Sequence, residues 1–447
     1  MTEHDLFGMD AVKGDNQRRP GHESAGQELA QPPRLREVDR TQVMWDPSSL
    51  DERLPHDHPA RTIWAVVERM DLSGLLEQIR ARGSAPGRAA SDPRVLVGLV
   101  LLAATEGIGS CREIERRCQR DIAYQWLCGG MSINYHTLSD FRVGHEKIVD
   151  KLLTDMLATL VNQGLVEVTR VTQDGVRVRA SAGRGSFRRG QTLKHLRDQA
   201  LEHVRRLKQQ QDDPQINARI KAAQARAARE RLERIDEALR QLPAAEAAKT
   251  RHTGKPSKDR PARVSTSDPQ VNRMKTGTGA VLPAWNVQLA SDPVSRAVVG
   301  VIIGNSGGDA QYAASMREQV EQRSGGTVSE HLIDGGYFNK KELERAHEQN
   351  VTVYMPLPKP TDNRPDPAVP VRGDGPGTLA WRARMTQETA KQLYKQRAST
   401  SETINADLTR HRGLGPLLVR GAEKVKCVVL WSVLAYNLMH FAQPLLK

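Results

Sequence analysis

His331-Leu-Ile-Asp-Gly-Gly-Tyr-Phe338 is a short apolar run that ends in an aspartate and then turns at two glycines. This pattern is typical of a buried strand that delivers a carboxylate, here Asp334, to the edge of a sheet. Residues 171–180 alternate like a second strand, which carries Asp174. Residues 391–408 have helical periodicity and include Glu402. Three carboxylates from two strands and a helix are the ligands that two Mg²⁺ ions need for phosphodiester chemistry, with Mn²⁺ as a substitute.

The elements around these acids predict a mixed α/β fold. Asp309 is expected to cap a helix over 309–323, and Asn339 a helix over 340–349. The expected strands are 167–180, 284–290, 297–303, the run to Asp334, and 351–355. Three strands followed by alternating helices and strands, with the Glu402 helix last, is the order of an RNase-H-like mixed sheet flanked by helices. Trp285 lies in the middle of a strand and is expected in the core.

The segment between the first two expected strands, residues 183–275, carries most of the net charge. It holds 23 Lys and Arg against 11 Asp and Glu, which is +12 of the formal +13. Apolar residues recur at three- and four-residue steps on both sides of Asp212-Asp-Pro214, so we expect a helical hairpin, followed by a loose linker over 250–266. A charged helix face is often only solvated, but this concentration favours contact with nucleic acid.

At 447 residues the chain is too long for one ordinary core. We expect a disordered tail over 1–46, an all-α N-terminal domain over 47–165, and a catalytic domain over 166–447 that the basic insertion interrupts. Short helices, tight turns and several arginines between 112 and 120 suit a helix-turn-helix-like DNA-binding module. The same pattern fits a purely structural helical bundle equally well.

Cysteine use and hydropathy bear on the cellular compartment. The four cysteines show no zinc-like spacing and are expected to be reduced thiols. The first residues carry no basic, apolar signal region. The apolar run 95–104 is far shorter than the ~20 residues of a membrane span, and polar residues interrupt the run 425–446. We therefore expect a soluble cytoplasmic protein without a membrane partner.

The motifs together resemble the catalytic signature of bacterial insertion-sequence DDE transposases. The resemblance rests on Asp174-Gly175, on Asp334-Gly-Gly-Tyr337 and on Tyr394-x-x-Arg397-x-x-x-x-Glu402. It extends to Cys128-Gly-Gly-Met-Ser-x-Asn-x-His-Thr-Leu-Ser-Asp-Phe-Arg142, which is similar to the helical N-terminal domain of that family. Residues 186–189, 274–277 and 286–288 resemble the flanks of its central insertion. Five motifs in the correct order argue against chance.

The resemblance implies a reaction and a set of roles. Asp174, Asp334 and Glu402 would bind a pair of Mg²⁺ ions. The residues implied to contact DNA are Arg188, Arg189, Lys275, Lys391, Tyr394 and Arg397. Of these, Arg397 could clamp a phosphate beside the metals. The family binds double-stranded DNA at terminal inverted repeats, cleaves at the element ends and joins a 3′-hydroxyl to target DNA. The resemblance also implies a homodimer in the synaptic complex. It implies a protein of the bacterial cytoplasm that is associated with the nucleoid when DNA is bound.

Two other hypotheses remain open at this point. The chain could be an inactive transposase remnant that only binds DNA, although all three carboxylates lie in intact motifs. It could also be an RNase-H-like nuclease without strand transfer. The basic insertion and the helical N-terminal domain favour a transposase over a nuclease, and a joined DNA product would distinguish the two.

Overall fold

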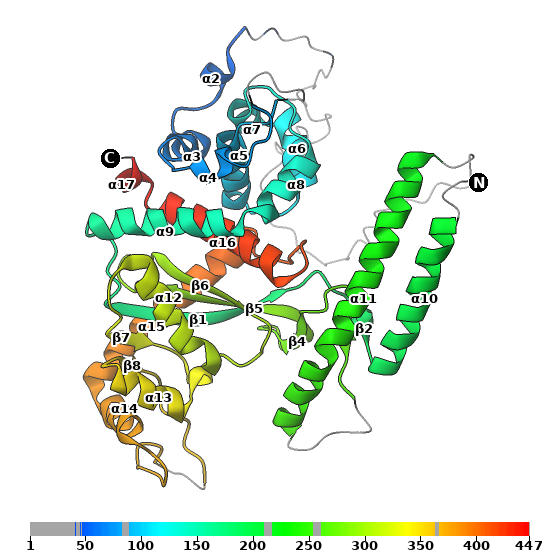
Figure 1. The fold of residues 1–447 in the computed structure, drawn as a ribbon. Helices are drawn as coiled ribbons and strands as arrows, with labels where there is room; N and C mark the ends of the chain where they lie inside the picture. The colour runs from blue at the N-terminus through cyan, green and yellow to red at the C-terminus, as the bar shows by residue number, and fades with distance from the viewer. Residues whose placement is uncertain are drawn as a thin grey trace, which may run out of the picture. The chain divides into compact units, whose positions relative to one another are not determined.

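One mixed sheet forms the centre of the computed structural model, which describes residues 41, 45, 47–82, 89–209, 217–253, 261–362 and 366–446. The sheet belongs to the compact unit Ser49–Lys447. Its strands are β1 (Arg170–Arg179), β4 (Asn272–Lys275), β5 (Val281–Ser291), β6 (Val298–Gly304), β7 (Glu330–Leu332) and β8 (Thr352–Tyr354). Strand β5 pairs with β1 along one edge and with β6 and β4 along the other, while β7 and β8 continue the sheet beyond β1 (Figure 1).

The pairing directions give the sheet an RNase-H-like topology. Strands β1, β5 and β6 are antiparallel neighbours, whereas β7 runs parallel to β1 and β8 parallel to β7. Across the sheet these five strands lie in the order β6, β5, β1, β7, β8. Numbered one to five in chain order, this is the order 3-2-1-4-5. The predicted fold class is confirmed, and the helical insertion lies between β1 and β5 as expected.

Helices lie on both faces of the sheet. On one face, α12 (Ala313–Ser324) packs on β6, where Gly300 leaves room for Met316 and Val320. On the other face, α15 (Glu388–Arg410) packs on β1, and its Ser401 hydroxyl donates to Thr172. Since side chains alternate along a strand, residues 172 and 174 of β1 face α15, whereas 173, 175 and 177 face the opposite side.

Side-chain amides from two helices bind the backbone of β6. Asn437 of α16 (Ala422–His440) accepts from the N–H of Val298 and donates to its carbonyl, both at 2.9 Å. Gln319 of α12 accepts from the N–H of Val301 at 2.7 Å. These contacts satisfy backbone groups of Val298 and Val301 that an edge strand would leave unpaired.

The remaining elements after β6 are short and are held by polar contacts. They are η3 (Ala310–Tyr312), η4 (Gly335–Tyr337), α13 (Lys340–Glu348), α14 (Pro376–Thr386) and α17 (Ala442–Leu445). The side chain of Asn339 caps α13 as predicted. Glu344 of α13 accepts from the N–H groups of Gly377 and Thr378, at 2.8 and 2.9 Å. A carboxylate therefore satisfies the free N–H groups at the start of α14 and fixes the end of the preceding Pro-rich loop.

The N-terminal helices share one hydrophobic core with the sheet. They are α2 (Leu50–Arg53), α3 (Pro59–Val67), α4 (Ser73–Leu76), α5 (Pro93–Thr105), α6 (Cys111–Arg120), α7 (Ile122–Leu127), α8 (Tyr135–Gly144) and α9 (Glu146–Asn162). Asp92 caps α5 and Pro93 is its first residue, as predicted. Helix α16 is buried along nearly its whole length because it packs on α5 and α9 as well as on β6. Apolar residues of α5, α9, α16, β5 and β6 belong to a single core.

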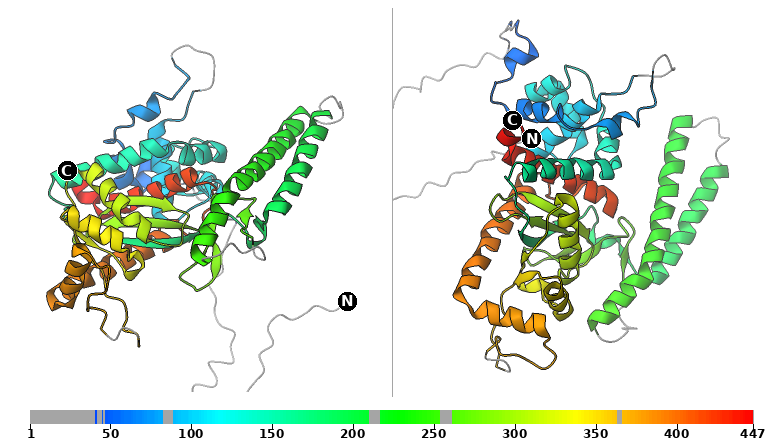
Figure 2. Two further views of the ribbon diagram at one scale, coloured as in Figure 1. Left: turned by 60° about the horizontal axis from the view of Figure 1, so that its bottom comes forward. Right: turned by 60° about the vertical axis from the view of Figure 1, so that its left-hand side comes forward.

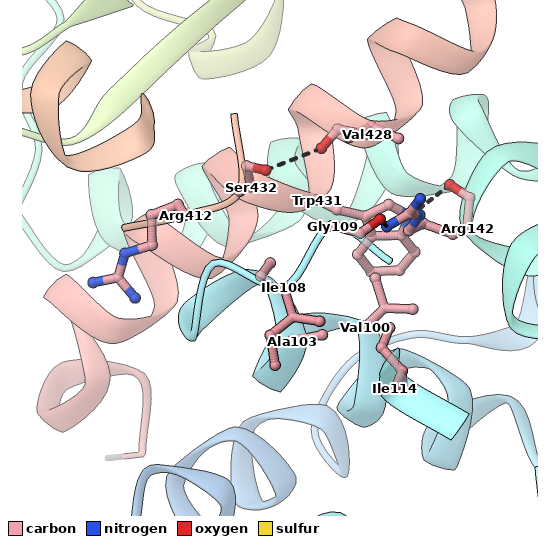
Figure 3. Close-up of a pocket in the computed structure, with 12 residues that line it drawn as sticks. Val100, Ala103, Ile108, Gly109, Ile114, Arg142, Arg412, Val428, Trp431 and Ser432 are labelled. Atoms are coloured by element: carbon pink, nitrogen blue, oxygen red, sulfur yellow. Dashed lines mark hydrogen bonds between the residues drawn. The ribbon is translucent and has the colours of Figure 1, made fainter. Parts of the chain in front are cut away.

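A small cavity lies where α5 meets α16 (Figure 3). Its volume is about 20 Å³, which is room for about one water molecule. Val100, Trp431 and Arg142 line it. Arg142 donates to the carbonyl of Gly109 at 2.6 Å, and its own carbonyl accepts from the Trp431 indole at 3.1 Å. The cavity is therefore a gap in the packing between these helices and is too small for a nucleotide.

The basic insertion contains a helical pair, as predicted. It consists of η1 (Arg184–Ser186), β2 (Phe187–Arg188), α10 (Gly190–Gln209), α11 (Ala218–Thr253) and β3 (Val264–Ser265). The two helices lie side by side (Figure 2) and enclose a small core around Leu193, Ala238 and Val264. The expected loose linker over 250–266 is wrong in part, because α11 runs to Thr253 and β3 pairs with β2. The alanine-rich run before Thr253 favours helix, and the small core buries Val264.

Other expectations can be compared with the structure directly. The four cysteines are free and buried, and Trp285 is in the core, as expected. No helix within the described ranges is both long and apolar enough to span a membrane. The expected disordered tail, apart from single positions near its end, and the expected turn at 212–214 lie outside the described residues.

Candidate active site

Asp174 lies in the middle of β1 and faces α15. Its Oδ2 accepts a hydrogen bond from Asn405 at 3.0 Å, and its Oδ1 lies 2.7 Å from Nη2 of Arg397. Arg397, Ser401 and Asn405 are spaced four residues apart, so they form the stripe of α15 that faces β1. The predicted first carboxylate is therefore held against the predicted last helix.

Asp334 follows β7, the parallel neighbour of β1. Its Oδ1 accepts from the N–H of Gly336 at 2.8 Å, so the side chain caps the turn made by the two glycines. Its Oδ2 lies 3.6 Å from the same Nη2 of Arg397 that contacts Asp174. Two adjacent parallel strands thus bring two predicted carboxylates to one guanidinium, as the pattern of the apolar run and the glycine pair indicated.

Burial and charge set the protonation of this group. Burial raises the pKa of Asp174 above its ordinary value, and Arg397 opposes this rise. Burial alone would lower the pKa of Arg397, but the nearby carboxylates, Asp174 first among them, raise it above its ordinary value. Asp334 is the more accessible acid, with 39% of its side chain exposed against 19% for Asp174. The pair is therefore a concentrated negative charge that one buried cation compensates.

Glu402 lies on α15 as predicted, but its side chain is exposed and has no described contact with either aspartate. It follows Ser401, so its side chain points about 100° away from the stripe that faces β1. Across the described residues, no three His, Cys, Asp or Glu side chains are grouped closely enough to hold a metal ion. Asp174 and Asp334 fit a divalent ion, because they offer hard oxygen ligands from adjacent strands. That Glu402 belongs to the site stays a prediction.

Asp309 is an acid beside the site whose role the sequence did not reveal. The helix expected over 309–323 begins after Asp309, as η3 followed by α12. The expected cap is wrong, because the Asp309 side chain makes no capping hydrogen bond. The carboxylate instead binds Arg177 at 2.7 Å and accepts from Asn286 and Gln288, at 2.8 and 2.6 Å. The available signal was the polar pair Asn286 and Gln288 within an otherwise apolar strand, because buried amides need partners.

The residues predicted to contact DNA lie in two regions. Arg188, Arg189 and Lys275 are exposed at the base of the insertion. Lys391 is exposed on α15, 3.8 Å from Glu388. Tyr394 is half-buried, and Arg397 is buried among the carboxylates described above. Their contact with DNA stays a prediction.

Two segments of the chain match known protein families. Residues 48–144 match the family described as Transposase domain (DUF772), and residues 378–442 match the one described as Transposase DDE domain. With the RNase-H-like sheet, these matches define a DDE transposase, an enzyme class that cleaves nucleic acid. The chain is assigned to the insertion-sequence DDE transposases, which confirms the resemblance of its motifs. No curated protein matches its sequence.

The second match includes Arg397 and Glu402, whereas Asp174 and Asp334 lie outside both matched segments. The assignment of the two aspartates therefore depends on their own geometry, namely their shared contact with Arg397.

Proposed function

We propose that this protein binds the terminal inverted repeats of an insertion sequence, cleaves DNA at the element ends and transfers the cut strand to target DNA. The observation that carries the proposal is the approach of Asp174 and Asp334 to one guanidinium at the edge of an RNase-H-like sheet. The transposase matches near both ends of the chain support it.

In the proposed mechanism Asp174 and Asp334 would hold divalent metal, with Glu402 as the predicted third ligand. Two Mg²⁺ ions bound there, or Mn²⁺ in their place, would supply charge neutralisation at the attacking and leaving oxygens of the phosphodiester. Asn405 orients Asp174, since it donates to the oxygen that Arg397 does not contact. Arg397 compensates the aspartate pair, and in this proposal it also binds the scissile phosphate.

The exposed basic residues of the insertion would bind the DNA backbone. Arg188 and Arg189 lie near the start of the insertion, just after η1, and Lys275 ends it before β5. Contacts with phosphate position a protein on a duplex without reading its sequence. We propose that this surface orients the element end over the aspartates, and that two copies of the chain pair two ends in the synaptic complex.

The test is cleavage of a DNA duplex that carries the repeats flanking the gene. The full chain and its Asp334→Ala variant are assayed with Mg²⁺ and with EDTA. We expect metal-dependent cutting and joined products for the wild type only, with DNA binding retained in the variant. Binding without cutting under any divalent metal would favour the DNA-binding remnant. Cutting that never gives a joined product would favour a nuclease.

A further inference from the structure

Asp309 is the centre of a polar network on the face of β1 opposite Asp174. Its Oδ1 accepts from the amides of Asn286 and Gln288, and its Oδ2 binds Arg177. Only 13% of the Asp309 side chain and 16% of the Arg177 side chain are exposed. Because both oxygens have close donors and the charge is balanced by Arg177, this carboxylate is already satisfied and is not placed as a metal ligand.

Gln288 links the network to residues near both predicted catalytic aspartates. The Oε1 of Gln288 accepts from the hydroxyl of Tyr337 and from Nε2 of Gln173, the latter at 2.8 Å. Gln173 is the neighbour of Asp174 on β1. Tyr337 ends the turn that Asp334 caps, and its side chain is buried. One amide therefore contacts the neighbour of Asp174 and the tyrosine three positions after Asp334. Asp309 favours this orientation of the amide by accepting from its nitrogen.

The network lies close to the glycine that follows Asp174 and near the second glycine after Asp334. A Cβ atom on Gly175 would lie 2.2 Å from the Gln288 amide nitrogen and 2.8 Å from Oδ1 of Asp309. A Cβ atom on Gly336 would lie 2.9 Å from Asp334 and 3.5 Å from Oδ2 of Asp309. The network therefore crowds Gly175, the residue after Asp174, whereas at Gly336 the close contact is with Asp334 itself and Asp309 lies at ordinary van der Waals distance. A rotated Gln288 amide would present a donor to Tyr337 instead of an acceptor.

We propose that Asp309 is a positioning residue that fixes the separation of Asp174 and Asp334 through Gln288 and Tyr337, and so sets the affinity of the aspartate pair for divalent ions. The inference rests on the proposed function, because it takes Asp174 and Asp334 as the metal ligands. Residues that orient metal ligands without touching the metal commonly change affinity or activity by about 10–100-fold when they are replaced.

The experiment measures binding of Mn²⁺ to the full chain without DNA, by electron paramagnetic resonance, beside the Mn²⁺ concentration that half-saturates DNA cleavage. The variants are Asp309→Asn, which keeps the shape but loses the charge, and Tyr337→Phe, which removes only the hydroxyl. The matched control is Asp374→Asn. Asp374 is also a buried acid, 2.8 Å from Arg382, and it lies in the loop before α14 without a described contact to the site.

We expect Asp309→Asn to weaken Mn²⁺ binding by about tenfold or more, and Tyr337→Phe to weaken it less. The double variant should bind about as weakly as Asp309→Asn alone, because both changes act through one amide. Asp374→Asn should lower the melting temperature without changing Mn²⁺ affinity. If Asp309→Asn does not fold, the comparison of Tyr337→Phe with the Asp374→Asn control tests the inference.

Equal Mn²⁺ affinity in the wild type and the Asp309→Asn and Tyr337→Phe variants would overturn the inference and leave the proposed function intact. Equal weakening by Asp374→Asn would also overturn it, since the effect would then be a general loss of stability. A wild type that neither binds Mn²⁺ nor cuts DNA would instead refute the proposed function, and the inference with it.

Discussion

The guanidinium of Arg397 lies 2.7 Å from Asp174. Because both side chains are largely buried, each charge depends on the other for compensation. The sequence suggested that Arg397 clamps a phosphate beside the metals. In the structure its Nη2 contacts two carboxylates, and its Nε is buried without a partner. An ion pair of this kind is costly to break from one side, because the remaining charge is left buried and uncompensated.

The first prediction concerns the loss of that cation. Arg397→Gln should destabilise the protein by roughly 1–3 kcal/mol in EDTA, because Asp174 loses its compensating charge. The pKa of Asp174 is already raised by burial and should rise further in the variant. Added Mg²⁺ should therefore stabilise the variant more than the wild type. Thermal unfolding with EDTA and with Mg²⁺ measures both effects.

The control for this prediction is Arg345→Gln. Arg345 lies 2.6 Å from Glu318, but both side chains are about half exposed. An exposed pair contributes up to about 1 kcal/mol, so this variant should change little and should not respond to Mg²⁺. A similar, metal-independent loss in both variants would show that Arg397 has only a packing role.

The second prediction tests the third carboxylate. Glu402→Gln should reduce DNA cleavage by at least about a thousandfold, with DNA affinity retained, if Glu402 completes the metal site. Glu388 is an exposed acid on the same helix, so Glu388→Gln is the matched control and should retain activity. Cleavage kinetics at saturating Mg²⁺ measure the difference. Retained cleavage by Glu402→Gln would remove this residue from the site.

The sequence predicted the architecture well because its signals were local. Alternating apolar residues predicted the strands, Asn339 and Asp92 began helices, and the order of elements defined the RNase-H-like sheet. The approach of Asp174 and Asp334 agrees with these signals, because β7 runs parallel to β1 with Leu332 opposite Thr172, and this register places Asp334 beside the middle of β1.

The sequence could not predict which side chains meet across the sheet. The role of Asp309 depends on Arg177, which is 132 residues away, and on amides of a third element. A local cap was the simplest interpretation of an aspartate before a helix. The orientation of Glu402 was equally hidden, because periodicity identifies a helix but does not fix which flank lies over β1.

The third prediction concerns pH. His331 is fully buried on β7 beside Arg317, and burial holds its pKa well below 6.5. Below about pH 6.5 the unfolded chain therefore binds a proton that the native protein does not. His331 should reduce stability as pH falls through that value, by up to ~1.4 kcal/mol per pH unit.

Urea unfolding between pH 7 and pH 5 measures this dependence. The variant His331→Asn should lose stability less steeply than the wild type over that interval. The exposed His195 provides the control, because His195→Gln should leave the slope unchanged. Equal slopes for His331→Asn and the wild type would contradict the prediction.

The fourth prediction concerns the base of the insertion. Replacing Arg188 and Arg189 by Gln should lower DNA affinity and reduce the salt dependence of binding, by up to about two in the slope of log K against log salt. Lys341 and Arg345 are exposed on α13, and their double replacement provides the comparison. Binding titrations at several salt concentrations measure the slopes. An unchanged slope would mean that Arg188 and Arg189 do not touch phosphate.

The burial of α16 has a consequence for how the chain can be divided. This helix contacts the N-terminal helices and the edge strand β6 at once, and one core includes them all. A fragment that begins at β1 would leave one side of α16 uncovered, and such an apolar surface promotes aggregation. The helical segment and the central sheet should therefore melt together in one cooperative transition, and limited proteolysis should yield neither as a soluble, folded fragment.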